Sequence, residues 1–226
     1  MKDRPFLFAI IVLVLAFFIL AGAFYPHMPE VMASHWNAQG EADGTISRFW
    51  GLFLFPLISV GMAALLLLIP GIDPLKANIQ KFKGYYYGFI IGFLVYFLYI
   101  YVLTLVWNLG WEFNFSQMII PAIGLLLYIV GVMVSKARRN FFIGIRTPWT
   151  LSNEEVWNRT HQLGGKLFKL VGIIILLLSF VPEIAIYALL GLVLGITVWL
   201  FVSSYVLYRR LGKHPQSPIE NNSDWP

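Results

Sequence analysis

Six stretches of the chain are apolar enough and long enough to cross a lipid bilayer. A bilayer-spanning helix needs about 20 predominantly apolar residues, and polar segments separate the six stretches from one another. The pattern therefore predicts an all-α membrane protein with six transmembrane helices. The predicted spans are 5–25, 50–70, 84–107, 118–135, 167–181 and 184–208.

The composition agrees with a membrane location. Hydrophobic residues make up 59% of the chain and charged residues only 12%, whereas soluble domains carry about 25% charged residues. The net charge of +5 would suggest nucleic acid as the partner of a soluble chain. In a membrane protein it indicates loops retained in the cytoplasm and contact with anionic lipid headgroups. We therefore expect the lipid bilayer as a partner and no direct contact with nucleic acid.

Basic residues are distributed very unevenly between the polar segments. When the spans are threaded through a membrane, Arg48 alone falls on one side, and the rest of the 16 Lys and Arg residues fall on the other. Because basic loops are retained in the cytoplasm, the sequence predicts a multi-pass cell-membrane protein with both termini cytoplasmic and residues 26–49 outside. Ala21-Gly22-Ala23 resembles a signal-peptide cleavage site, but the apolar run before it exceeds a signal core, so we expect an uncleaved first span.

The spans divide into two halves of three. Residues 1–107 hold the first three spans and the outward loop 26–49, residues 108–213 hold the last three spans and a cytoplasmic motif at 140–168, and residues 214–226 form a cytoplasmic tail. Three spans per half would place the halves in opposite orientations, as in the 3+3 inverted repeats of transporters. No ionisable residue lies at the centre of a predicted span, which argues against ion-coupled transport.

Glycines at intervals of four residues predict close helix packing. Small residues at this spacing let helix backbones approach one another. We expect them to serve packing within one bundle, and the alternative is a homodimer face. The glycines are Gly84, Gly88 and Gly92 in the third span and Gly191 and Gly195 in the sixth.

The outward loop 26–49 contains residues that indicate a compact cap. Gly40 can take a positive φ without strain, and Asn37 and Asp43 favour turns. We expect His35 and Asp43 to hydrogen-bond to each other or to the loop backbone. His and carboxylate side chains are also zinc ligands, but their spacing here matches no metal-site signature, so we expect no metal and no cofactor.

The cytoplasmic motif 140–168 combines a constrained turn with a helix start. Pro148 disfavours the helical conformation at Thr147 and so predicts an extended turn there. Ser152 and Glu155 have the spacing of a capping box, which predicts that a helix begins at this point.

This helix is expected to lie in the membrane interface before it turns into the span 167–181. Trp149 and Trp157 are expected to anchor it there, because tryptophan favours the membrane–water boundary. We expect Arg146 to have a fixed partner, such as a loop carbonyl or a nearby carboxylate, because a guanidinium group offers five donors in a rigid fork.

Both loops resemble segments of a known family. The cytoplasmic motif resembles the signature of the SdpI-like family of bacterial membrane immunity proteins. The outward loop resembles the domain of unknown function that commonly precedes that signature. The residues that carry the first resemblance are Asn140, Gly144, Ile145, Arg146, Thr147, Pro148, Trp149, Thr150, Leu151, Ser152, Trp157, Thr160 and His161. Those that carry the second are Pro29, His35, Asn37, Gly40 and Asp43.

The resemblance implies an immunity or toxin-sensing role. It implies protection against a membrane-active peptide toxin met outside and capture of a transcriptional repressor in the cytoplasm. We expect the first contact with the peptide at Trp36, Glu41 and Asp43, with His35 and Asn37 holding the shape of the loop. No residue receives a catalytic role. The alternatives are a small-solute or peptide transporter and, more weakly, a metal-dependent membrane enzyme.

Overall fold

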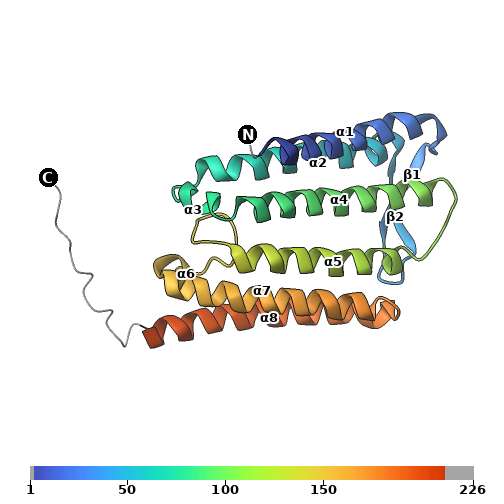
Figure 1. The fold of residues 1–226 in the computed structure, drawn as a ribbon. Helices are drawn as coiled ribbons and strands as arrows, with labels where there is room; N and C mark the ends of the chain where they lie inside the picture. Colours follow the sequence, from blue (N-terminus) through green and yellow to red (C-terminus); the bar gives the residue numbers. More distant parts are fainter. Residues whose placement is uncertain (1–2, 212–226) are drawn as a thin grey trace.

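Six long helices lie side by side in the computed structural model, which describes residues 3–211 (Figure 1). All six are long and apolar enough to cross a membrane, as predicted. The predicted tail 214–226 lies outside the described residues. The helices are α1 (Arg4–Phe24), α2 (Arg48–Ile72), α4 (Lys83–Asn108), α5 (Phe115–Lys136), α7 (Glu154–Leu178) and α8 (Pro182–Leu211).

The connections gather at two opposite ends of the bundle (Figure 1). We call one the hairpin end, because it carries the strands β1 (Val31–Trp36) and β2 (Ala42–Ser47) after the short helix η1 (Tyr25–His27). We call the other the motif end, because it carries the segment 137–153. The short helices α3 (Lys76–Gln80) and α6 (Pro148–Ser152) also lie at the motif end.

The fifth long helix differs from its predicted span. Helix α7 is one continuous helix, so the predicted interfacial helix that turns into a separate span at 167–181 is wrong. The predicted cap is also wrong, because Ser152 closes α6 and its hydroxyl donates to the Trp149 carbonyl. Asn153 caps α7 instead, and its side-chain oxygen accepts from the Val156 N–H at 3.0 Å. Asn is as good an N-cap as Ser, and the helix starts within two residues of the predicted point.

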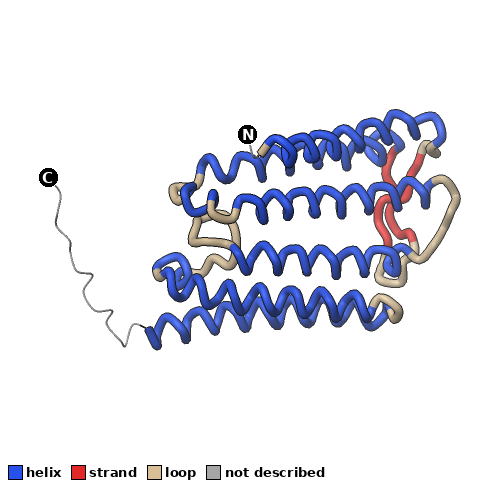
Figure 2. The backbone as a smooth tube through the Cα atoms, viewed as in Figure 1, coloured by secondary structure: helices blue, strands red, loops and turns tan. Residues whose placement is uncertain are grey.

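The all-α prediction missed a pair of strands (Figure 2). β1 and β2 pair antiparallel, with Val31 opposite Ser47 and Trp36 opposite Ala42, and the register shifts on both sides of His35. Such an irregularity lets a short strand pair change which way its side chains point.

Glycines bring helices α5 and α7 together, and of the predicted glycines Gly92 alone lies at a close helix contact. A Cβ added at Gly131 would lie 2.8 Å from the Gly165 carbonyl oxygen, so α5 and α7 approach with almost no space between their backbones. Gly124 and Gly172 repeat this contact two turns further along. In contrast, a Cβ added to the predicted glycines would meet the Ile129 side chain at Gly92 and nothing within 4 Å at Gly84, Gly88, Gly191 or Gly195.

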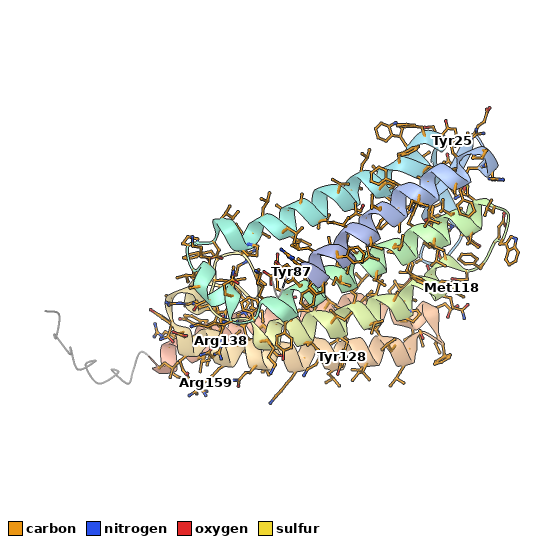
Figure 3. All side chains as sticks on the ribbon, turned by 45° about the horizontal axis from the view of Figure 1, so that its top comes forward. Tyr25, Tyr87, Met118, Tyr128, Arg138 and Arg159 are labelled. Carbon is orange, nitrogen blue, oxygen red and sulfur yellow. The ribbon has the colours of Figure 1, made fainter. Side chains whose placement is uncertain are left out.

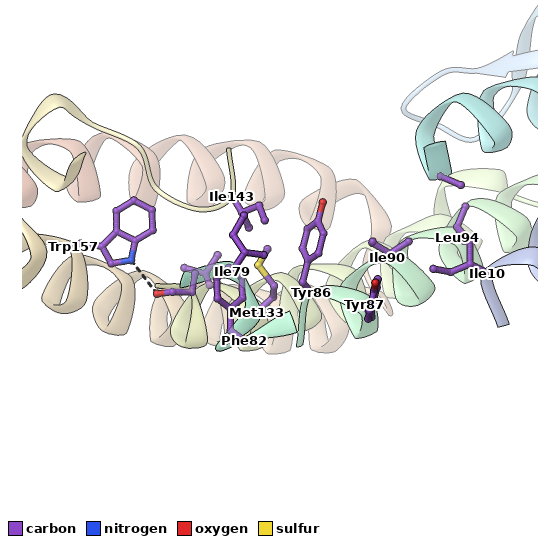
Figure 4. Close-up of a cluster of buried hydrophobic side chains, with 13 residues drawn as sticks. Ile10, Ile79, Phe82, Tyr86, Tyr87, Ile90, Leu94, Met133, Ile143 and Trp157 are labelled. Carbon is purple, nitrogen blue, oxygen red and sulfur yellow. Dashed lines mark hydrogen bonds between the residues drawn. The ribbon is translucent and has the colours of Figure 1, made fainter. Parts of the chain in front are cut away.

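Buried side chains form three apolar clusters, and large apolar side chains also cover the outside. The first cluster lies towards the motif end and joins both halves, for example through Ile79, Tyr86, Met133 and Trp157 (Figure 4). The other two lie within the first half and the second half, respectively. Side chains project outward along the whole length of the helices (Figure 3). An apolar exterior of this kind is stable in lipid and not in water.

Candidate functional site

The two predicted motifs lie at opposite ends of the bundle (Figure 1). His35, Asn37, Gly40 and Asp43 are in or beside the hairpin. The remaining candidates belong to the segment before α7 or to the first turns of α7. They therefore form two separate sites.

Asn37 shapes the turn between the strands. Its side-chain oxygen accepts from the backbone N–H groups of Gln39 and Glu41, both at 3.0 Å. Gly40 has a φ of +83°, as expected for a residue that needs the left-handed region. The His35 and Asp43 side chains are hydrogen-bonded to each other across the two strands, which confirms one of the two alternatives predicted for them.

The hairpin is tied to both halves of the bundle. At the end of α4, the Asn108 side chain accepts from the Ala33 N–H at 2.7 Å and donates to the Ala33 carbonyl at 3.0 Å. At the start of α5, Asn114 donates to the Gln39 carbonyl at 2.8 Å and Ser116 donates to the Asn37 carbonyl at 3.1 Å. Sequence analysis missed Asn108 and Asn114. Their signal is an amide side chain placed where an apolar run ends or begins.

Trp36 faces the bundle rather than the outside. Its ring stacks on Phe115 with a centroid distance of 3.7 Å and an interplanar angle of 5°.

An acidic hollow of about 580 Å³ lies beside the turn and contains Glu41 from the hairpin and Glu112 from the α4–α5 connection. The remaining lining residues of this hollow are Gln39, Gly40, Ala42, Trp107, Phe113 and Asn114. Its only ionisable groups are therefore two carboxylates.

At the motif end, Asn140 organises the chain after α5. It is fully buried, and its amide group donates to the carbonyls of Arg138 at 2.7 Å and Ile143 at 2.9 Å. Its oxygen accepts from the N–H groups of Phe142 and Ile143. All four hydrogen-bonding positions of one buried amide are thus used, which explains why this position needs Asn.

His161 and Trp157 of α7 hydrogen-bond to the backbone of the same loop. The Ile145 N–H donates to His161 Nε2 at 3.0 Å, so the proton of the ring is on Nδ1, which donates to the Trp157 carbonyl at 2.9 Å. Trp157 is fully buried, stacks on His161 and donates from Nε1 to the Ala137 carbonyl at 2.9 Å (Figure 4). The prediction that Trp157 anchors an interface is therefore wrong. Gly144, at φ +110°, lies directly over the His161 ring, where a side chain would collide with Nε2.

The turn Thr147-Pro148 connects this loop to α8. Thr147 is extended, as predicted, and it forms the real capping box of this region with Thr150. Its hydroxyl also lies 3.1 Å from the Ser204 hydroxyl of α8. Trp149 packs against Phe201 of α8 with a centroid distance of 5.0 Å, so it serves helix packing as well as any interfacial role.

Arg146 has the fixed partner that was predicted. Its guanidinium donates to the Phe141 carbonyl at 2.8 Å and closes the loop on its exposed side.

A buried carboxylate from the first half of the chain also hydrogen-bonds to this loop, and sequence analysis missed it. Asp73, directly after α2, accepts from the Leu75 N–H at 2.6 Å and from the Phe141 N–H at 2.8 Å. Its signal was an Asp at the end of a long apolar run.

Neither end offers a cluster of metal ligands within residues 3–211. No group of three or more His, Cys, Asp or Glu side chains in that part of the chain could hold a metal ion.

Sequence comparisons agree with this division into two sites. The profile of the SdpI/YfhL protein family matches residues 136–206, and that of a domain of unknown function (DUF1648) matches residues 11–60. The Immunity protein SdpI of Bacillus subtilis (strain 168) is 28% identical over 202 residues, which cover 89% of this chain and 95% of that protein. No solved structure matches the chain.

The fold and the two sites define a multi-pass, six-helix membrane protein with a hydrogen-bonded loop at one end and a docked hairpin at the other. The matched profiles and the relative that aligns along most of its length show that the chain is similar to proteins of the SdpI-like family.

Proposed function

We propose that this protein is a membrane immunity protein that protects its cell against a membrane-active peptide toxin. The observation that carries the proposal is the similarity to an immunity protein over 89% of the chain. The alignment includes both polar ends of the bundle, since it spans nearly the whole of each protein.

The acidic hollow at the hairpin end supports a cationic peptide as the toxin. Glu41 and Glu112 line it from two different segments, and both belong to the side predicted to face outward. Glu41 also accepts from the Asn37 amide at 3.2 Å, so its carboxylate is held in place. Asp43 is engaged with His35, which makes it a residue that holds the hairpin rather than a first contact. Trp36 is likewise turned inward, so Glu112 replaces these two in the proposed contact.

The test is survival of a sensitive host that expresses the protein and is challenged with cationic membrane-active peptides. We expect wild type to protect. Glu41→Gln with Glu112→Gln should reduce protection about fivefold, because each exposed charge pair contributes roughly 0.2–1 kcal/mol. The matched control, Glu30→Gln with Glu183→Gln, removes the same charge on the same side of the membrane outside the hollow and should protect fully.

Two outcomes would count against the proposal. If wild type protects against no peptide although it reaches the membrane, the immunity function itself is wrong. If the hollow variant protects as well as the control, the function stands but recognition does not begin at the hollow.

We further propose that the motif end signals to a transcriptional repressor in the cytoplasm. Phe141 and Phe142 support this proposal, because they expose 46% and 40% of their surface on a loop that Asn140 and Asp73 hold rigidly. A fluorescent fusion of a candidate repressor should move to the membrane when toxin is present. If it stays in the cytoplasm although the cells are protected, immunity does not involve this step.

A further inference from the structure

A small polar cavity lies at the motif end, between the last turn of α5 and the second and third turns of α7. Its volume is about 220 Å³. The lining residues are Ser135, Lys136, Ala137, Arg138, Asn158, His161 and Gln162. They include two permanently basic side chains, two amides and no carboxylate.

The backbone that forms one wall is fixed by buried side chains. The Ala137 carbonyl accepts from Trp157 Nε1, and the Arg138 carbonyl accepts from Asn140. His161 in the floor already uses both ring nitrogens. The backbone that carries Lys136 and Arg138 is therefore fixed before any ligand arrives, so binding an anion orders only their side chains.

The charge around the cavity is positive and is not neutralised by carboxylates. The ion pairs within residues 3–211 are His35–Asp43, Lys83–Asp3 and Arg159–Glu155. None of them uses Lys136 or Arg138. Lys136 lies over the Tyr85 ring instead, 5.7 Å from its centroid, which keeps its ammonium group near the surface of the bundle.

The depth of the cavity matches that of lipid phosphates. Lys136 is the last residue of a spanning helix, and Arg138 follows two residues later (Figure 3 labels Arg138). The ends of spanning helices lie at the level of the headgroups. Lys166, four residues after Gln162 and so on the same face of α7, extends the basic surface towards the apolar part of the helix.

We propose that this cavity binds a phosphate-type anion, supplied by the headgroup of an anionic phospholipid. Lys136 and Arg138 bind the phosphate oxygens, and the amides of Asn158 and Gln162 donate to the remaining oxygens of the headgroup. This site is separate from the acidic hollow at the hairpin end and does not depend on the immunity function.

The test uses the full chain, purified and delipidated in a neutral detergent. Native mass spectrometry should show phosphatidylglycerol bound at least about tenfold more tightly than phosphatidylcholine with the same acyl chains, since each basic residue near anionic lipid is worth about 1 kcal/mol. Lys136→Gln with Arg138→Gln should abolish this preference. Arg209→Gln with Arg210→Gln removes the same charge from α8 and should retain it.

A second measurement needs no variant. A phosphatidylglycerol analogue with a photoreactive headgroup should label wild type within 135–138 or 158–162. Labelling confined to α8, or equal losses in the two double variants, would overturn the cavity as the site. Stabilisation by millimolar inorganic phosphate, with no preference for phosphatidylglycerol, would overturn the lipid as the source of the anion.

Discussion

Replacing Gly144 by Ala tests the contact between the motif loop and His161. The change does two things at once. It places a Cβ at a residue whose φ is +110°, and it drives that Cβ into the His161 ring at Nε2. The ring must then move, and the hydrogen bond from the Ile145 N–H, now 3.0 Å long, is lost.

The two costs can be added from the structure. A residue with a side chain at a strained positive φ costs about 1–3 kcal/mol. A partly buried N–H that loses its acceptor costs about 1–3 kcal/mol more. The expected loss in the free energy of unfolding is therefore about 2–6 kcal/mol. For a chain of this length a loss of 1 kcal/mol lowers the melting temperature by roughly 2–4 °C, so we expect a decrease of about 4–24 °C.

Two control variants separate the costs. Gly110 also has a positive φ, +94°, but an added Cβ there meets nothing within 4 Å, so Gly110→Ala reports the backbone strain alone. Gly88 lies inside α4 with equally open space, so Gly88→Ala should keep or slightly raise the melting temperature.

The assay is thermal unfolding of the purified variants in one detergent, followed by tryptophan fluorescence. Gly144→Ala should melt lowest, Gly110→Ala next and Gly88→Ala no lower than wild type. If Gly144→Ala and Gly110→Ala melt together, the His161 contact adds nothing to stability. That result would refute the reasoning about the motif loop.

Two further predictions concern Arg146 and the topology. Arg146→Lys keeps the charge but loses the fixed bond to the Phe141 carbonyl, so we expect a melting temperature a few degrees lower, with Arg209→Lys unchanged as control; equal melting of both variants would show that the bond is not stabilising. The chain has no cysteine, so a single cysteine introduced at Ala42 or at Ser152 is unique. An impermeant reagent should label the cysteine at Ala42 in intact cells and the cysteine at Ser152 only after the membrane is permeabilised. Labelling of both from outside would refute the predicted orientation, with both termini in the cytoplasm.

The spans could be predicted because each one is a long apolar run that can be read from the sequence alone. An uninterrupted apolar run needs no knowledge of its neighbours, and the helices begin and end within a few residues of the predicted limits, except in α7. In that segment, the charged residues between Glu154 and Lys169 led to the prediction of a separate interfacial helix. They are tolerated in a continuous helix because its buried face carries Trp157, His161 and two glycines, while Glu154, Arg159 and Lys166 are exposed.

The glycines show why helix pairing could not be predicted. Gly84 and Gly88 have the regular spacing, yet their surroundings are open. Gly131 and Gly165 stand in different helices, and only the three-dimensional arrangement shows that they face each other. The hairpin was missed for a related reason, because its strands are short and lack a clear alternation, and its stability depends on Asn108 and Asn114 from distant segments.

The ties between the halves have a consequence for biogenesis. Ribosomes deliver the chain from the N-terminus, so the hairpin reaches its side of the membrane before Asn114 and Ser116 exist. Until α5 is inserted, the Asn37 and Gln39 carbonyls lack the donors that later hold them. The tie from Asp73 to the Phe141 N–H likewise closes only after α5 has emerged. A nascent chain of three helices thus lacks these hydrogen bonds between the halves. They form at both ends of the bundle only when α5 and the loop after it have been translated.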